Sequence, residues 1–266
     1  MWLIFLPAQP AFPAGLCDIL CRHAVPADRR PHLTRVRKLL LLLVPPLLIL
    51  LAAWGGLLRL PPRWDPFAPL DLRAEPNLMT GPKLARMDWQ EASCFVAFEA
   101  SALPLTRLPD SAGGQCPLEN VVRMPVTDPA LSPAGPIATC AMAASWELFA
   151  RFVLQPAALE HFGQRVVRVR QLGTFSCRPV RTDRGSGTQL SQHGRANALD
   201  VAGFVLEDGR EVSVMRDWND PGPRGAFLRD AHRGACRFFN AVLGPGYNNV
   251  HRDHFHLDRG PWRVCR

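Results

Sequence analysis

The densest cluster of chemically versatile side chains lies near the C-terminus, where three of the eight histidines fall within six residues: His251, His254 and His256. If residues 253–258 form a β-strand, His254 and His256 project from one face of it, while Phe255 points to the core. Two imidazoles side by side suit a metal ligand and a proton-handling partner. An H-x-H pair alone is a weak signal, because surface histidines also pair by chance.

A second polar stretch, S-Q-H-G-R-A-N-A-L-D, covers residues 191–200. It places His193 in a loop and Asp200 near the start of an apolar strand, where a carboxylate is costly to bury unless it is paired or coordinates a cation. The alternative is an aspartate that caps an element or lies at a sheet edge. A catalytic zinc site takes three protein ligands and leaves one position for water. His193, Asp200 and His256 would supply nitrogen, oxygen and nitrogen, a donor set suited to Zn²⁺.

The pattern S-x-H-x-x-x-x-A-x-D, followed by a C-terminal H-x-H, resembles the zinc peptidases that cleave D-alanyl and related bonds in peptidoglycan. These include the D-alanyl-D-alanine carboxypeptidases and the penicillin-insensitive murein endopeptidase, whose fold also occurs in the hedgehog signalling domain. The closer resemblance, over about residues 75–266, is to the bacterial extensin-like C-terminal domain family. The stretches that carry it are VLQPAALEHFGQRV, FSCR, SQHGRANALDVAGF, GACRFFNAVLGPGYN and HRDHFHLD.

The resemblance implies roles for individual residues. His193, Asp200 and His256 correspond to the zinc ligands of the peptidases. Arg178, in S-C-R, resembles the arginine that precedes the first ligand and would stabilise the oxyanion. A guanidinium suits that role, because its charge is permanent and its donors form a fixed fork.

The proton-transfer group is less sharply implied. The carboxypeptidases have a glutamate where this chain has Asp253, whereas the endopeptidase has histidines at the positions of His251 and His254. The resemblance therefore ranks His254 first, His251 second and Asp253 third. Ala196 stands where the peptidases usually have glycine, and a positive φ there would cost about 1 kcal/mol or distort the loop.

The elements that must position these side chains follow from hydrophobic periodicity. Apolar residues at helical spacing predict a helix over 138–154, which Gln155-Pro156 would end. Alternation predicts a β-hairpin of strands 198–206 and 211–215, with Asp208-Gly209 at the turn. The other predicted elements are helices over 157–162 and 225–243, the latter ended by Gly244, and strands over 166–170, 173–178 and 253–258. Helices and antiparallel strands in this order indicate an α+β domain with a small antiparallel sheet and flanking helices.

Residues 39–58 form a run of twenty residues without a charge. At 1.5 Å per residue, such a helix spans about 30 Å, the thickness of the hydrocarbon core of a bilayer. The basic residues just before it, Arg35, Arg37 and Lys38, predict a transmembrane anchor with this flank in the cytoplasm. A cleaved signal peptide is the alternative, because Pro45-Pro46 interrupts the run and small residues follow.

The rest of the chain divides around this run. Residues 1–38 are predicted to be a cytoplasmic segment, with a true translation start near Leu33 or Val36 as the alternative. Residues 59–84 are rich in proline and predict an extended tether. Residues 85–266 would form the peptidase-like domain, so we expect a single-pass protein of the inner membrane with that domain in the periplasm.

Six cysteines follow the apolar run. An even number without a C-x-x-C pair, in a domain predicted to be exported, indicates disulfides rather than a zinc ribbon. Six cysteines allow fifteen connectivities, and the sequence does not choose among them. They are Cys94, Cys116, Cys140, Cys177, Cys236 and Cys265.

Composition narrows the function classes. Hydrophobic residues make up 47% and charged residues 20% of the 266 residues, which excludes disorder for most of the length. Residues 1–38 carry half of the net charge of +8, so the remainder is not basic enough to indicate nucleic-acid binding. The leading hypothesis is a membrane-anchored zinc hydrolase that cuts peptide bonds in peptidoglycan stem peptides. The alternatives are a non-catalytic wall-binding or structural domain with the same fold, and a metal-free module held together by disulfides.

Overall fold

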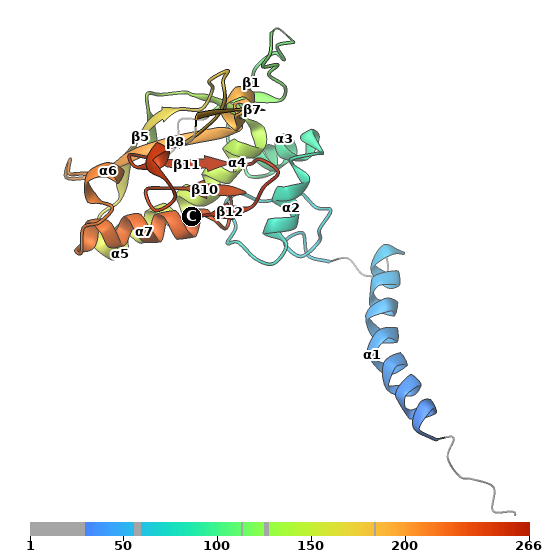
Figure 1. The fold of residues 1–266 in the computed structure, drawn as a ribbon. Coiled ribbons are helices and arrows are strands. Elements are labelled where there is room, and N and C mark those ends of the chain that lie inside the picture. The colour runs from blue at the N-terminus through green and yellow to red at the C-terminus, as the bar shows by residue number, and fades with distance from the viewer. Residues whose placement is uncertain (1–29, 56–59, 113, 125–127, 184) are drawn as a thin grey trace, which may run out of the picture. The chain divides into compact units, whose positions relative to one another are not determined.

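A computed structural model describes residues 30–55, 60–112, 114–124, 128–183 and 185–266 (Figure 1). The chain divides into two compact units, Met1–Arg59 and Leu60–Arg266. Residues 1–29, most of the predicted N-terminal segment, lie outside the described residues.

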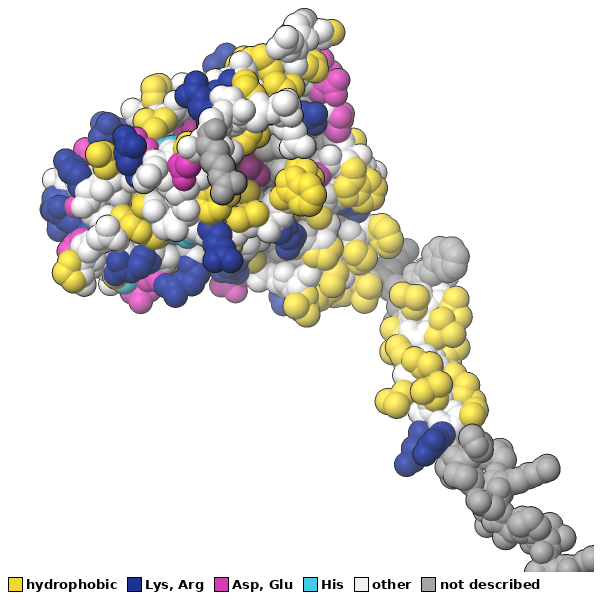
Figure 2. Space-filling view, in the orientation of Figure 1, with side chains coloured by type: hydrophobic (Ala, Val, Ile, Leu, Met, Phe, Trp, Pro, Cys, Tyr) yellow, Lys and Arg dark blue, Asp and Glu magenta, His cyan; other side chains and the backbone are white. Residues whose placement is uncertain are grey.

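The first unit contains one described helix, α1 (Arg30–Trp54), with Pro45 and Pro46 inside it. Its leucines between Leu39 and Leu51 are exposed, and Figure 2 shows hydrophobic side chains along the helix after the basic residues near its start. The helix expected over 39–58 is seen as far as Trp54, and residues 56–58 lie outside the described part. Among the described residues, no helix is long and apolar enough to cross a bilayer.

The second unit is built on a mixed sheet with the strand order β12-β10-β11-β8-β5-β3, in which β9 also pairs with β8. The strands β10, β11, β8, β5 and β9 pair in antiparallel fashion, while β3–β5 and β10–β12 are parallel pairs at the two edges. The α+β class is therefore confirmed, but the sheet is mixed rather than antiparallel throughout. The bounds are β3 (Ala130–Ser132), β5 (Val166–Gly173), β8 (Ala198–Leu206), β9 (Glu211–Ser213), β10 (Ala241–Leu243), β11 (Phe255–Asp258) and β12 (Val264–Cys265).

Helices pack on this sheet through a shared apolar core. They are α4 (Cys140–Phe149), η1 (Ala150–Leu154), α5 (Gln155–Phe162), α6 (Val214–Asp217) and α7 (Pro223–Ala235). Trp146 of α4, Phe227 of α7 and Phe204 of β8 are almost fully buried in one core cluster. The rings of Phe204 and Phe227 meet edge to face at 5.2 Å between centroids. This contact fixes the long strand β8 against the helical layer.

Gln155-Pro156 does not end the first predicted helix. A single π-helical turn, η1, follows α4, and α5 continues directly with Pro156 in its first turn. Proline lacks the backbone N–H that donates a hydrogen bond in the interior of an α-helix. In the first turn of a helix this N–H has no intrahelical partner, so proline is tolerated there. The helix therefore continues beyond the proline after one turn of wider, π-helical geometry. It ends at Phe162, and Gly163 caps it in the left-handed conformation.

Two other predicted elements differ from the structure. The helix expected over 225–243 ends at Ala235, and Ala241–Leu243 is strand β10. The apolar run before Gly244 is compatible with both helical and strand periodicity, and it forms a strand because it pairs with β11. The strand expected over 173–178 is absent beyond Gly173. Instead β6 (Pro179–Thr182) pairs with β7 (Gly185–Leu190) in an exposed ribbon.

The predicted hairpin is confirmed, with β8 and β9 joined by a turn in which Gly209 has φ +83°. Only glycine adopts this conformation at little cost. The second strand is shorter than expected, because α6 begins at Val214.

Residues 60–84, expected as an extended tether, pack onto the domain. Leu72 is fully buried in the core cluster, and Lys83 Nζ donates to the carbonyl of Pro62 at 2.7 Å. The helices α2 (Thr80–Arg86) and α3 (Glu91–Ala100) follow. A small antiparallel sheet of the order β1-β2-β4 then leads into α4, with β1 (Thr106–Arg107), β2 (Val121–Arg123) and β4 (Ile137–Thr139).

The six cysteines form three disulfides, as predicted: Cys94–Cys140, Cys116–Cys177 and Cys236–Cys265. The first joins α3 to α4, and the third joins the end of α7 to β12. The second links residues 61 apart in sequence and anchors the segment just before Arg178. Cross-links of this span restrict the unfolded chain and so stabilise the folded domain.

Candidate metal centre

The pairing of β8 with β11 brings Asp200 and His256 together. The two residues lie directly opposite each other in the antiparallel register, so their side chains stand on one face of the sheet. His256 Nδ1 lies 2.9 Å from Asp200 Oδ1. Phe255 faces the other way and is buried against Phe204, so the predicted opposition of His256 and Phe255 is confirmed. The strand is shorter than the predicted 253–258, because β11 begins at Phe255 and His254 precedes it.

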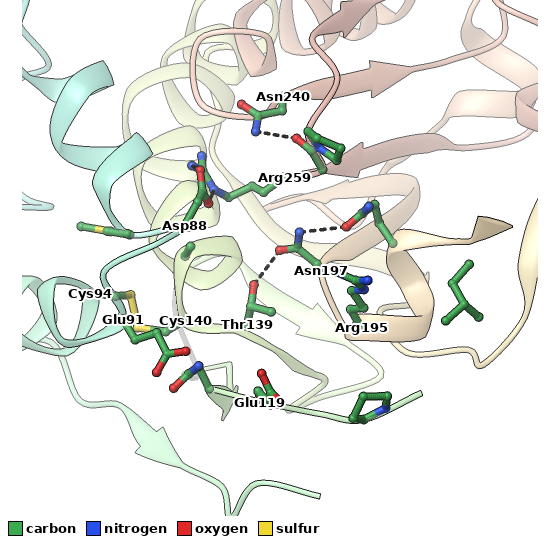
Figure 3. A pocket seen from close by; sticks show the side chains of 18 of the residues that line it. Asp88, Glu91, Cys94, Glu119, Thr139, Cys140, Arg195, Asn197, Asn240 and Arg259 are labelled. Carbon is green, nitrogen blue, oxygen red and sulfur yellow. Dashed lines mark hydrogen bonds and ion pairs between the residues drawn. A yellow bond between two sulfur atoms is a disulfide. The ribbon is translucent and has the colours of Figure 1, made fainter. Parts of the chain in front are cut away.

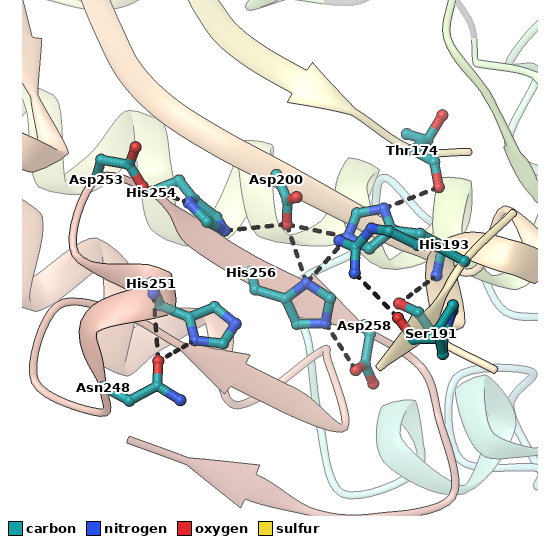
Figure 4. Close-up of polar contacts among 12 residues, drawn as sticks. Thr174, Ser191, His193, Asp200, Asn248, His251, Asp253, His254, His256 and Asp258 are labelled. Atoms are coloured by element: carbon teal, nitrogen blue, oxygen red, sulfur yellow. Dashed lines mark hydrogen bonds and ion pairs between the residues drawn. The ribbon is translucent and has the colours of Figure 1, made fainter. Parts of the chain in front are cut away.

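His193 reaches the same point from η2 (Gln192–Arg195), the 3₁₀ turn that precedes β8. The Ser191 hydroxyl caps this turn by accepting from the His193 backbone N–H. His193 is 3% exposed, and its Nε2 lies 3.1 Å from both Asp200 Oδ1 and His256 Nδ1 (Figure 4). Two nitrogens and one carboxylate oxygen, far apart in sequence, thus converge on one point.

The second nitrogen of each ring shows which atom carries the proton. His193 Nδ1 lies 3.1 Å from the carbonyl oxygen of Thr174, and His256 Nε2 lies 3.0 Å from Asp258 Oδ2. Oxygens of these types only accept, so both nitrogens donate. The nitrogens that face Asp200 therefore carry lone pairs when the rings are neutral. Three electron-rich atoms this close repel one another unless a proton or a metal cation lies between them.

Zinc fits this donor set. Ligands bonded at about 2.0–2.1 Å to a tetrahedral zinc lie about 3.3 Å from one another. The three separations here are 2.9, 3.1 and 3.1 Å, so a shift of a few tenths of an ångström would admit the ion. Orientation of each imidazole by a carbonyl or carboxylate is also usual around protein-bound zinc.

Electrostatics agree with a cation here. Burial alone would raise the pKa of Asp200, but hydrogen bonds from His193 and His256 hold it well below its ordinary value. Burial alone would lower the pKa of His256, but the carboxylates of Asp200 and Asp258 outweigh it and raise this pKa to about 9. Without a metal, a proton on His256 thus takes the place of the cation.

His254 lies beside the three converging atoms. Its Nδ1 is 2.8 Å from Asp253 Oδ1, and its Nε2 is 3.5 Å from Asp200 Oδ1. The Asp253 carboxylate accepts from Nδ1, which leaves the lone pair of Nε2 facing the centre. Asp253, with a side chain 45% exposed, therefore contacts the centre only through His254. Of the two, His254 has the better geometry for proton transfer.

His251 completes the cluster from η3 (Asn249–His251). Its ring centroid lies 5.4 Å from that of His254 and 5.7 Å from that of His256, and its Nδ1 contacts Asn248 Oδ1 at 2.6 Å. Burial and the neighbouring histidines lower its pKa to about 4, so His251 is neutral near pH 7.

Arg178 is near the cluster but does not touch the three converging atoms. Its backbone carbonyl accepts from Ser191 N at 3.1 Å, and its guanidinium lies 3.5 Å from the carbonyl of Pro179. Its charge nevertheless contributes to the lowered pKa of His251. An oxyanion role for Arg178 would need its side chain to swing toward the centre.

Ala196, at the end of η2, adopts φ +52°, the left-handed conformation. Ala196 therefore has the positive φ that is unfavourable for a residue other than glycine, and its side chain is fully buried. The loop nevertheless directs His193 at Asp200. At Gly194 the constraint is different, because a Cβ there would lie 3.2 Å from the sulfur of Cys116. Hence the Cys116–Cys177 disulfide lies directly against the turn that carries His193.

Comparison with known sequences agrees with these observations. The family model described as "Extensin-like protein C-terminus" matches residues 92–266. The chain belongs to this extensin-like family. The match includes every residue of the cluster. No curated protein and no solved structure gives a match.

Three contributions to the centre of this extensin-like domain were missed in the sequence. Asp258 lies two residues after His256, so strand alternation could have placed both on one face. The Thr174 carbonyl had no such signal, because it comes from a segment expected to be a regular strand. Asn248, which caps η3 and accepts from the His251 backbone, lies in a turn-rich stretch without periodicity.

Proposed function

We propose that the extensin-like domain is a zinc-dependent hydrolase that cuts peptide bonds in bacterial peptidoglycan. The observation that carries the proposal is the convergence of His193 Nε2, His256 Nδ1 and Asp200 Oδ1 with their ring protons directed outward. Bound there, zinc would polarise a scissile carbonyl and make a water molecule a stronger nucleophile near neutral pH.

The chain's own residues would supply the proton transfers. His254 Nε2 accepts the proton from the attacking water and returns it to the leaving amine, while Asp253 holds the tautomer that leaves Nε2 free. Arg178, turned toward the centre, would balance the charge on the carbonyl oxygen. Asp258 and the Thr174 carbonyl keep the two ligand imidazoles oriented.

The substrate and compartment are supported by different features. The resemblance of the S-x-H-x-x-x-x-A-x-D and H-x-H patterns to peptidoglycan peptidases supports stem peptides as the substrate. Three disulfides support an oxidising compartment such as the periplasm, because cytoplasmic thiols are kept reduced.

The test has a metal arm and an activity arm. The purified full chain should contain about one zinc per chain and release peptide fragments from purified peptidoglycan. His193→Ala should lose the zinc and the activity, whereas the control His161→Gln, at a histidine paired with Asp230 outside the centre, should keep both. Retention of zinc by His193→Ala would remove the ligand assignment.

A non-catalytic wall-binding domain is the second candidate. It is favoured by Asp253, which stands where the carboxypeptidases have a glutamate and is bonded to His254 instead of facing the centre. Zinc-loaded chain that binds peptidoglycan without releasing any peptide would support this candidate. His254→Ala separates the two, because it should keep the zinc and abolish only hydrolysis.

A further inference from the structure

A pocket of about 700 Å³ adjoins η2 without including any residue of the histidine cluster (Figure 3). Four stretches far apart in sequence line it, within residues 87–94, 115–120, 139–141 and 190–197, and residues 240 and 259–261 complete it. Its volume is typical of sites for small molecules.

The free charges in this pocket are of opposite sign and do not meet. Glu91 and Glu119 lie on one side, and Arg195 extends from η2 on the other. All three side chains are exposed, and none forms a hydrogen bond or ion pair with another described residue. The pocket therefore presents an anionic and a cationic wall to whatever enters it.

A second pair of charges in the pocket is already satisfied. Arg259 forms an ion pair with Asp88, and its guanidinium also donates to Ser145 Oγ at 3.1 Å and to the carbonyls of Phe238 and Leu84 at 2.9 and 3.2 Å. The Arg259 side chain is only 3% exposed. This pair is structural, so the charges left for a ligand are those of Glu91, Glu119 and Arg195.

Amide groups hold the walls in place. Asn197 Nδ2 donates to Gln192 Oε1 at 3.0 Å, and Asn197 Oδ1 accepts from Thr139 Oγ1 at 2.7 Å. The Cys94–Cys140 disulfide, which lines the pocket, ties the stretch that bears Glu91 to α4. A pocket whose walls are fixed in advance loses little conformational entropy when a ligand binds.

We propose that this pocket binds a small zwitterion, an amino acid or short peptide whose free ammonium group lies at Glu91 and Glu119 and whose free carboxylate lies at Arg195. A guanidinium matches a carboxylate through two parallel N–H donors. A ligand with only one of these charges leaves the opposite wall unpaired. The proposal goes beyond the hydrolase function, because the pocket shares no residue with the metal centre and needs no ion.

Titration calorimetry on the full chain, with metal removed by a chelator, tests the proposal with three peptides. Trialanine carries both charges, N-acetyltrialanine lacks the ammonium group, and trialanine amide lacks the carboxylate. Trialanine should bind at least about tenfold more tightly than either blocked peptide. Arg195→Gln should remove that advantage over the amide, and Glu91→Gln combined with Glu119→Gln should remove it over the acetylated peptide.

Matched controls are Arg168→Gln and Glu160→Gln, at exposed residues outside the pocket, which should leave all three affinities unchanged. Equal affinities for the three peptides would overturn the proposal. So would tighter binding of the amide, which would identify a site for cations, or no binding of trialanine up to about 10 mM. The peptide series on the unaltered chain decides the matter even if a variant fails to fold.

Discussion

His193 and Arg195 lie two residues apart in η2, yet their surroundings are opposite. Both ring nitrogens of His193 have partners, and the side chain is buried in the cluster. Arg195 is exposed and has no partner among the described residues. The side of the turn that bears His193 is buried among the converging ligand atoms, whereas the side that bears Arg195 opens into the pocket with its charge unpaired among the described residues. Metal affinity should therefore depend on the His193 side and not on the charge of Arg195.

The largest effect is expected at Asp200, the carboxylate that His193 faces on the buried side of the turn. Asp200→Asn keeps the shape of the side chain and removes the charge that faces two imidazole lone pairs. Zinc content should fall from about one ion per chain to below about a tenth, because an amide is a poor zinc ligand. Metal analysis after dialysis measures it, with Glu160→Gln as the unaffected control. Full zinc content in Asp200→Asn would contradict the assignment of the centre.

A smaller loss of zinc affinity is expected at Asp258, which contacts the ligand His256 but not the ion itself. Asp258→Asn removes the negative charge that accepts from His256 Nε2. Zinc affinity, measured by competition with a chelator, should fall about 10- to 100-fold. Asp253→Asn is the matched control, because its carboxylate contacts His254 and neither ligand histidine. An equal loss in both variants would mean that general electrostatics, not orientation of His256, sets the affinity.

The metal-free chain should lose stability as the pH rises. The pKa of His256 is raised to about 9 in the fold, against an ordinary value of 6.5. The stabilisation is therefore fully present below about pH 6.5 and is lost as the pH rises through about 9, at most about 3 kcal/mol. Thermal unfolding with a chelator at a series of pH values measures it. His256→Asn should show no such loss, and a chain that gains stability over this range would contradict the role of the His256 proton.

The smallest effect is expected at Ala196, between the two sides. Glycine would relieve the left-handed conformation by about 1 kcal/mol, but it would also remove a buried methyl group of about the same value. The free energy of unfolding of Ala196→Gly should therefore change by less than about 1 kcal/mol, and its zinc content should not change. Denaturant titration and metal analysis check both. Loss of zinc in this variant would show that the strained conformation itself positions His193.

The two sides also differ in how far the sequence predicts them. The triad His193, Asp200 and His256 could be proposed because strand alternation and the cost of a buried carboxylate are local signals, and β8 with its hairpin was found in the same way. The pocket could not be proposed, because its walls come from residues 87–94, 115–120, 139–141 and 190–197. Those segments meet through core packing and through disulfides whose pairing has fifteen alternatives in the sequence.

The errors in the fold have a common physical origin. The stretch after Ala235 is apolar enough for a helix or a strand, and only pairing with β11 makes residues 241–243 a strand. Pro156 is a helix breaker by its local chemistry, but the π-helical turn η1 ends just before it and the helix continues as α5. Residues 60–84 contain many prolines, and Leu70, Leu72 and Leu84 still enter the core. In each case tertiary contacts outweigh a local preference.

The contact between Gly194 and Cys116 predicts which positions evolve together. A methyl group at 194 would press on the disulfide sulfur at 3.2 Å, so the cysteine pair keeps that position at glycine although its backbone needs no special φ. Relatives that have lost both Cys116 and Cys177 should tolerate alanine or serine beside the histidine at position 193, and those that keep the pair should not.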